Sequence, residues 1–419
     1  MCRHGGAAAA SRSTLEVGEI FRQHGSVCRQ RYKLTPEQLR VMKDIETCRT
    51  AVRGGCLDTC DHCGHQVPAY ASCGNRHCPK CQALHQARWI HQRMARILAV
   101  LHFHIVFTLP EQLRSLILCN RKVLYDLLFK TASETLLQLG QDPKLLGGQM
   151  GITAVLHTWT RQLEFHPHVH CVVTAGGLQA VEDRWLDSSP DFLLSVRVMS
   201  RLFRGKFLSA LQDLYDRGQL EFAGGCSDLA QPAAFRRLKD KLYQKEWVVH
   251  AKKPFAGPEH VFRYLGRYTH RVAISNQRLI AAGPPGVTFA TKDGKRCTLS
   301  PEEFIRRFLL HVLPAGFTKI RHYGLYASSC VKTKLGQARR LLSDRAPGSS
   351  PPGAADLCSR LQAEDKDLSA LAFLELMLLL TQVDLSICPR CGIGRMRRTH
   401  VPPSTAPRGT QAVLPEDTS

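Results

Sequence analysis

The chain has 419 residues, 44% hydrophobic and 22% charged, which is enough for two or three domains with buried cores. Its 57 Lys and Arg against 35 Asp and Glu give a formal net charge of +22 and an isoelectric point near 9.6. Such an excess favours a polyanionic partner, because each neutralised phosphate releases counterions. We therefore expect a nucleic-acid partner first and an anionic membrane surface second. A soluble protein that is merely basic is the third interpretation.

Neither the N-terminus nor the most apolar stretch indicates export or membrane insertion. The first fourteen residues contain no apolar core beyond four alanines, unlike a signal peptide. The stretch from Leu368 to Leu385 is interrupted by Glu375 and Asp384, which favours a buried helix. Several of the 17 cysteines are spaced as Cys-x-x-Cys, which indicates metal thiolates in a reducing compartment. We expect a cytoplasmic protein.

The elements expected along the chain mix strands and helices without strict alternation, which favours an α+β fold over a doubly wound one. A helix begins at the capping box Thr35-Pro36-Glu37-Gln38. Hydrophobic periodicity and turn residues predict the following elements. They are helices at 85–100, 113–139, 200–215, 257–271 and 300–313, strands at 103–108, 152–159 and 169–174, and two hairpins before residue 300, the second turning at 292–294.

A cysteine-rich block predicts a structural zinc site. Cys60 and Cys63 form one Cys-x-x-Cys pair, and Cys78 and Cys81 form a second pair after fourteen intervening residues. Four thiolates at such spacing are typical of closed, tetrahedral zinc sites. Other potential ligands lie nearby in the sequence, so a different ligand set or a second ion stays open; these are Cys48, Cys56, Cys73 and His77.

A further pair, Cys388 and Cys391, lies close to the C-terminus. The pair supplies two ligands, and His400 is a remote third. Two interpretations are equally balanced, half of a zinc knuckle or two thiols without a metal.

Three histidines fall within five residues, His166, His168 and His170, on a predicted strand. Because side chains alternate along a strand, His168 and His170 share one face and could chelate a divalent ion. His166 shares that face and could join the site. The sequence leaves the third ligand open, with three nearby candidates, His157, Gln162 and Glu164.

Two tyrosines, Tyr264 and Tyr268, are separated by one helical turn on a predicted helix. Three arginines recur at the same four-residue spacing. Arg263 and Arg267 each precede one of the tyrosines, and Arg271 follows Arg267 by one helical turn. Their guanidinium groups could clamp phosphate oxygens. Taken alone, two tyrosines at this spacing are more often core packing. Beside a metal ion they fit a nucleophile, because a cation favours the phenolate of a group whose pKa is normally ~10.

The order of these motifs resembles the two-tyrosine rolling-circle transposases of bacterial insertion sequences, the insertion-sequence-ninety-one type, within the HUH endonucleases. The resemblance runs from about Phe21 to Leu342. It rests on Phe103-His-Ile-Val-Phe-Thr-Leu-Pro110, His166-Pro-His-Val-His170, Tyr264-Leu-Gly-Arg-Tyr-Thr-His-Arg271, and the zinc-block segment Ser72-Cys-Gly-Asn-Arg-His-Cys-Pro-Lys-Cys81.

The resemblance implies a catalytic antiparallel sheet with helices on one face, and Mg²⁺ or Mn²⁺ at His168 and His170. It implies cleavage of single-stranded DNA at transposon ends and target through a 5′-phosphotyrosine on Tyr264 or Tyr268, in a bacterial, nucleoid-associated setting. Neither a membrane nor a nucleotide cofactor is expected. A plasmid-type replication initiator or relaxase, and a non-catalytic zinc-dependent DNA-binding regulator, are the alternatives.

The predicted domains follow from these motifs and from composition. They are a helical and zinc-binding domain at 15–100, an HUH-type catalytic domain at 101–342, a linker rich in Pro, Gly, Ser and Ala at 343–367, a helix with a Cys-x-x-Cys pair at 368–400, and a disordered tail at 401–419.

Overall fold

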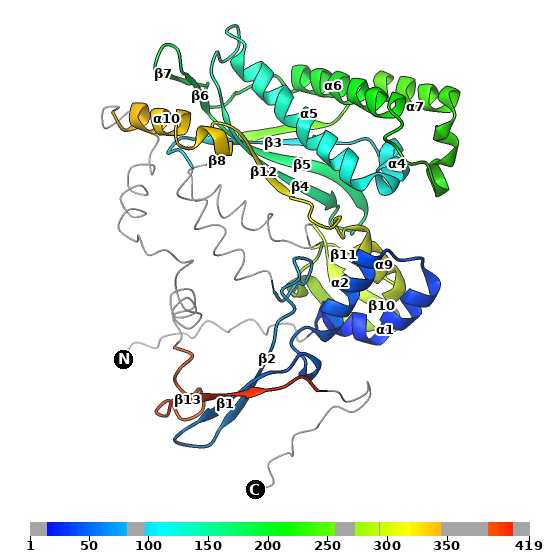
Figure 1. Cartoon of the computed structure of the whole chain (residues 1–419), viewed down its shortest axis with the longest axis vertical. Helices are drawn as coiled ribbons and strands as arrows, with labels where there is room; N and C mark the ends of the chain where they lie inside the picture. The colour runs from blue at the N-terminus through cyan, green and yellow to red at the C-terminus, as the bar shows by residue number, and fades with distance from the viewer. Residues whose placement is uncertain (1–14, 82–96, 256–272, 293, 345–383, 405–419) are drawn as a thin grey trace.

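The computed structural model describes residues 15–81, 97–255, 273–292, 294–344 and 384–404 (Figure 1). Its α-helices are α1 (Val17–Arg31), α2 (Pro36–Thr47), α4 (Arg114–Cys119), α5 (Arg121–Gln141), α6 (Val196–Asp216), α7 (Pro232–Gln244), α9 (Pro301–Leu310) and α10 (Lys334–Ser343). Short 3-10 helices are η1 (Ala51–Arg53), η2 (Glu111–Leu113), η3 (Gly224–Ala230), η4 (Asn276–Arg278) and η5 (Ser328–Cys330).

The strands are β1 (Gly55–Cys60), β2 (Gln66–Tyr70), β3 (His102–Thr108), β4 (Gly151–Trp159), β5 (Phe165–Thr174), β6 (Gly176–Gln179), β7 (Arg184–Asp187), β8 (Val249–Phe255), β9 (Leu279–Gly283), β10 (Gly286–Ala290), β11 (Arg296–Leu299), β12 (Ile320–Gly324) and β13 (Met396–Val401). The mixture of antiparallel sheets and helices confirms the predicted α+β class. Among the residues described, no helix is long and apolar enough to cross a membrane.

A five-stranded sheet forms the centre of the largest unit, with the order β12-β4-β5-β3-β8 and every neighbouring pair antiparallel. Helices α5 and α6 cover one face (Figure 1). The apolar side chains that alternate along β3 point into this layer: Phe103, Ile105 and Phe107 are all buried in one core with both helices. The opposite face carries the histidines of β3, β4 and β5.

Helix α6 covers the sheet because its apolar residues recur every four positions. Met199, Phe203, Phe207 and Leu211 are buried, and the ring of Phe203 meets that of Phe107 at 5.0 Å in an edge-to-face contact. The helix predicted at 200–215 is therefore confirmed. The single helical segment expected at 113–139 divides at Asn120, whose side-chain amide donates hydrogen bonds to the carbonyls of Leu116 and Glu221.

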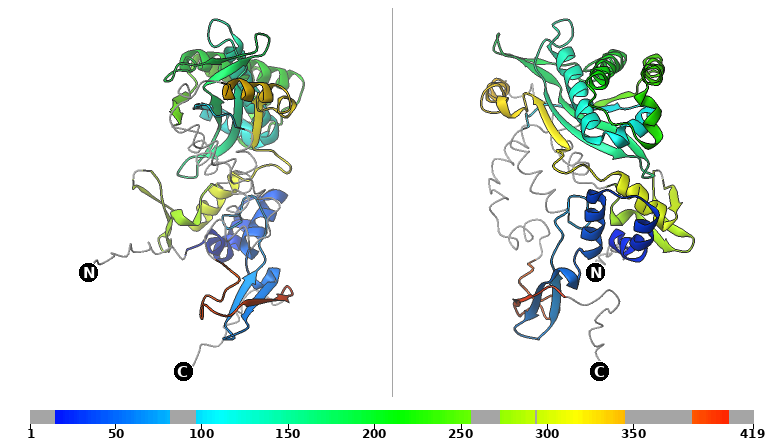
Figure 2. Two further views of the ribbon diagram at one scale, coloured as in Figure 1. Left: turned by 90° about the vertical axis from the view of Figure 1, so that its left-hand side faces the viewer. Right: turned by 45° about the vertical axis from the view of Figure 1, so that its right-hand side comes forward.

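A second core joins the N-terminal helices to a later part of the chain. Helices α1 and α2 pack with α9 and the β9-β10-β11 sheet (Figures 1 and 2). The ring centroids of Phe21 and Phe308 lie 5.2 Å apart. The capping box at Thr35 is present, with Gln38 closing it. A domain boundary at residue 100, as predicted, would cut through this core. These contacts join residues more than 250 positions apart, which local sequence patterns do not reveal.

A third small sheet joins a C-terminal strand to the zinc block near the N-terminus. Strand β13 pairs with β1 in antiparallel register from Gly55 opposite Val401 to Cys60 opposite Met396, and β2 lies on the other side of β1. In Figures 1 and 2 the red β13 lies beside the blue β1. Residues 396–401 were predicted as the end of the Cys-x-x-Cys segment and the first residue of a disordered tail, and they form a strand. The apolar stretch from Leu368 falls largely outside the described residues.

Candidate active site and metal centres

Three histidines meet on the face of the central sheet opposite to α5 and α6. His168 and His170 alternate on β5, and His157 lies directly opposite His168 on β4. One ring nitrogen from each of the three lies within 4.8 Å of the others. The cluster thus contains the histidine pair singled out by the sequence and one of its three candidates for a third ligand.

The other candidates lie elsewhere. Gln162 and Glu164 are exposed in the turn between β4 and β5, and His166 is not part of the cluster. His166 contributes through its backbone, because its carbonyl oxygen accepts a hydrogen bond of 2.6 Å from Nδ1 of His168. A neutral His168 with its proton on Nδ1 leaves the lone pair of Nε2 available to a metal ion.

A fourth histidine, His104 on β3, contacts the cluster through His170. Its Nε2 lies 2.8 Å from Nδ1 of His170, and the two rings stack with centroids 5.0 Å apart and planes 6° apart. A histidine that binds a metal ion usually directs its other ring nitrogen to such a partner, which fixes the tautomer and the ring orientation. His104 lies in the segment from Phe103 to Pro110 on which the family resemblance partly rests, but the sequence did not predict that it takes part in the site.

Burial keeps the imidazoles of His168 and His170 in the neutral form that binds metal ions. Desolvation lowers the pKa of His168 to about 4, and desolvation together with His157 and His168 holds the pKa of His170 well below its usual value. Three imidazole nitrogens on two adjacent strands, with His168 and His170 held neutral, fit a divalent ion. Because Mg²⁺ prefers oxygen ligands whereas imidazole suits first-row transition ions, Mn²⁺ fits this donor set better than Mg²⁺.

The tyrosines and arginines of the predicted helix, Tyr264, Tyr268, Arg263, Arg267 and Arg271, lie outside the described residues. The chain resumes at Ala273, which is buried and lines a small cavity together with Trp159 and His311. Trp159 in turn stacks on His157, with ring centroids 4.6 Å apart. The segment that follows Tyr268 therefore re-enters the described structure beside the histidine cluster.

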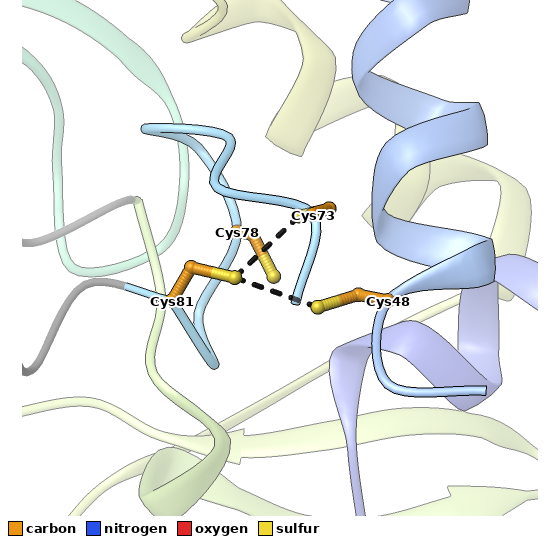
Figure 3. Close-up of side chains that lie close together, drawn as sticks. All are labelled: Cys48, Cys73, Cys78 and Cys81. Carbon is orange, nitrogen blue, oxygen red and sulfur yellow. Dashed lines mark hydrogen bonds between the residues drawn. The ribbon is translucent and has the colours of Figure 1, made fainter. Parts of the chain in front are cut away.

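The first cysteine cluster consists of Cys48, Cys73, Cys78 and Cys81 (Figure 3). Cys48 follows the last residue of α2, and the other three belong to the loop after β2. The Sγ atom of Cys81 lies 3.5 Å from that of Cys48 and 3.6 Å from that of Cys73. Four sulfurs at this separation suit one tetrahedral zinc ion.

The second cluster consists of Cys60, Cys63, Cys388 and Cys391. The predicted set of Cys60, Cys63, Cys78 and Cys81 is thus divided between two clusters. The cause is the β1-β2 hairpin, which carries Cys60 and Cys63 at its turn, about five residues or roughly 17 Å from the loop with Cys78. Two Cys-x-x-Cys pairs next to each other in the sequence are held apart by the hairpin between them.

The basic residues of the zinc block connect it to the rest of the protein. Arg76 donates hydrogen bonds to the carbonyls of Phe317 and Pro314, at 2.5 and 2.7 Å, and Lys80 forms an ion pair with Glu16. The His77 ring accepts a hydrogen bond from the backbone N–H of Leu313. These side chains hold the loop of the zinc block against the rest of the protein.

Comparison with known proteins identifies the family. A family model described as a transposase zinc-binding domain matches residues 20–109, and one described as a putative transposase matches residues 151–334. The putative transposase y4qJ of Sinorhizobium fredii is 45% identical over 393 residues, which cover 92% of this chain and 95% of the relative. The chain belongs to the IS91 family of transposases.

A second transposase is also similar to this chain. The transposase for insertion sequence element IS801 of Pseudomonas savastanoi pv. phaseolicola is 29% identical over 340 residues, 74% of this chain and 77% of the relative. No solved structure matches the chain. The IS91-type zinc-binding model includes the first cysteine cluster entirely but ends long before Cys388 and Cys391. The transposase model spans all three clustered histidines and both tyrosines.

Proposed function

We propose that this IS91-family transposase nicks and rejoins single-stranded DNA at element ends through phosphotyrosine intermediates, in rolling-circle transposition. Tyr264 and Tyr268 are the nucleophiles. His168, His170 and His157 hold the divalent ion. The observation that carries the proposal is the cluster of three imidazoles on one face of the sheet, in a chain that belongs to a family of transposases.

The chemistry is a transesterification. The phenol oxygen of one tyrosine forms a bond to phosphorus as the bond from phosphorus to the 3′ oxygen breaks, leaving a 5′-phosphotyrosine and a free 3′-hydroxyl. The bound ion would polarise the phosphoryl oxygen under attack. Because one phosphoester is exchanged for another, a 3′-hydroxyl can later displace the tyrosine and reseal the strand without a nucleotide cofactor.

The surroundings of the histidine cluster support this use. One face of the sheet packs against the large apolar core, whereas the described residues on the face with the histidines form the small apolar cluster around Val155 and Val172. Lys252, an exposed residue opposite His104 on β8, adds positive charge to the same face. Ala273 and Trp159 bring the chain that follows Tyr268 to the edge of the cluster.

The direct experiment is a cleavage assay on a denaturing gel. Labelled single-stranded oligonucleotides that tile the DNA on both sides of the gene are incubated with the protein and Mn²⁺ or Mg²⁺. We expect one oligonucleotide to yield a covalent protein adduct, and the double variant Tyr264→Phe/Tyr268→Phe to yield none. Tyr243→Phe, at an exposed tyrosine of α7, is the matched control and retains the adduct. An adduct in the double variant would remove both tyrosines from the mechanism.

A further inference from the structure

Two chain segments more than 320 residues apart form a matched pair of metal-binding turns. Each has the sequence Cys-x-x-Cys-Gly, and the glycines Gly64 and Gly392 both have a positive φ, +69° and +68°. In each turn the N–H of the glycine donates a hydrogen bond to the carbonyl of the first cysteine, at 3.2 and 2.9 Å. Glycine adopts this backbone conformation without the strain that a side chain would add.

Backbone N–H groups in both turns point at sulfur. The Sγ atom of Cys60 accepts hydrogen bonds from the N–H groups of residues 62 and 63, both at 3.4 Å. The Sγ atoms of Cys388 and Cys391 accept equivalent bonds from Arg390 and Gly394, also at 3.4 Å. Such bonds favour the charged thiolate, which is the form that binds a metal ion.

The two turns face each other. The sulfurs of Cys60 and Cys391 lie 3.8 Å apart, as do those of Cys63 and Cys388, and all four lie within 4.8 Å of one another. Gly394 allows the two turns to approach this closely, because a Cβ atom at this position would lie 2.5 Å from the Cys60 sulfur. Asp61 accepts a hydrogen bond of 2.7 Å from the backbone N–H of Arg395, which interlocks the two turns.

The surrounding sheet has almost no apolar core of its own. Within residues 55–70 and 384–404, the buried residues other than glycine are Cys60 and Cys388. A two-stranded hairpin such as β1-β2 is marginal in water, and a three-stranded sheet this small needs another source of stability. A structural zinc ion provides such stability directly as folding free energy.

We propose that Cys60, Cys63, Cys388 and Cys391 bind a second structural zinc ion, which joins the C-terminal segment to the zinc-binding domain. The chain therefore carries two zinc ions, the other at Cys48, Cys73, Cys78 and Cys81. The zinc-binding domain is completed only when the C-terminal segment has been made, since half of the second ligand set lies there. The inference is independent of the tyrosine chemistry proposed above.

Elemental analysis of the full-length protein tests the inference. We expect two zinc ions per chain in the wild type and one in Cys388→Ser/Cys391→Ser. The matched control is Cys56→Ser/Cys330→Ser, which removes two thiols that belong to neither cluster and keeps both ions. Cys391→His should also keep both, because histidine can replace one thiolate at a structural zinc site. One zinc in the wild type, or two in the Cys388/Cys391 variant, would overturn the inference.

Alkylation of the unaltered protein provides a second measurement, in case the double variant does not fold. Cys63 is exposed, so its thiol should react readily with iodoacetamide unless zinc protects it. We expect Cys60, Cys63, Cys388 and Cys391 to be protected in the zinc-loaded protein and to become reactive together on chelation. Reaction of Cys63 and Cys391 in the loaded protein, or disulfides between the two turns, would contradict the proposal.

Discussion

The ring of His104 lies behind that of His170, with Nε2 of the first 2.8 Å from Nδ1 of the second. When His170 binds a metal ion through Nε2, its Nδ1–H donates to His104, which holds the ring in the binding orientation. In the proposed metal site His104 is therefore a positioning residue, because it would act on the metal ion through His170.

Replacing His104 tests this role. In His104→Ala the hydrogen bond is lost, and we expect the Mn²⁺ concentration for half-maximal cleavage to rise about 10- to 100-fold. In His104→Gln a side-chain carbonyl can still accept from His170, so most of the affinity should remain. Cleavage at saturating Mn²⁺ should recover in both variants. Equal Mn²⁺ requirements for His104→Ala and the wild type would show that the contact has no part in metal binding.

The three clustered histidines should be required for full cleavage activity and dispensable for the fold. We expect His168→Ala and His170→Ala to abolish adduct formation and His157→Ala to weaken it strongly, while circular dichroism stays unchanged. His322→Ala, in β12 on the same sheet, is the control, since His322 hydrogen-bonds Thr153 outside the cluster. Normal cleavage by His168→Ala or His170→Ala would exclude that residue as a ligand.

The apolar layer beneath the sheet should determine the stability of the catalytic unit. Phe107 is fully buried and packs edge-to-face on Phe203, so Phe107→Ala should lower the free energy of unfolding by about 3–5 kcal/mol. Val181→Ala, at a side chain that is 98% exposed, should change it little. Urea unfolding followed by circular dichroism measures both. Equal midpoints for the two variants would contradict the assignment of this core.

The first cysteine cluster should stabilise the second core. Cys48, Cys78 and Cys81 are buried among the apolar residues of α1, α2 and α9, so loss of zinc exposes that core to rearrangement. We expect Cys78→Ser to lose one zinc ion and to lower the melting temperature, whereas Cys330→Ser changes neither. An unchanged melting temperature after complete zinc removal would contradict a structural role for the ion.

Local patterns in the sequence predicted much of the central sheet. Alternation along β5 placed His168 and His170 on one face, and runs of apolar residues located β3, β4 and α6. Choosing His157 as the partner of His168 requires the register of β4 against β5. That register depends on the packing of the whole sheet, so the sequence left three candidates.

Contacts between distant segments account for what the sequence could not predict. Cys60 and Cys63 were grouped with Cys78 and Cys81 because spacing is a local signal, whereas their neighbours in the structure are Cys388 and Cys391. The shared core of α1, α2 and α9 crosses the predicted domain boundary for the same reason. The tyrosine pair is known only from sequence, since residues 256–272 lie outside the described structure.

The most direct test of the phosphotyrosine mechanism is to locate the nucleotide on the protein. Trypsin cuts after Arg263, Arg267 and Arg271, so Tyr264 and Tyr268 fall on separate four-residue peptides, Tyr-Leu-Gly-Arg and Tyr-Thr-His-Arg. The covalent adduct is isolated, digested with nuclease and trypsin, and analysed by mass spectrometry. The mechanism predicts a nucleotide on one or both of these peptides. A nucleotide on another residue, or none on the protein in a reaction that cuts DNA, would contradict it.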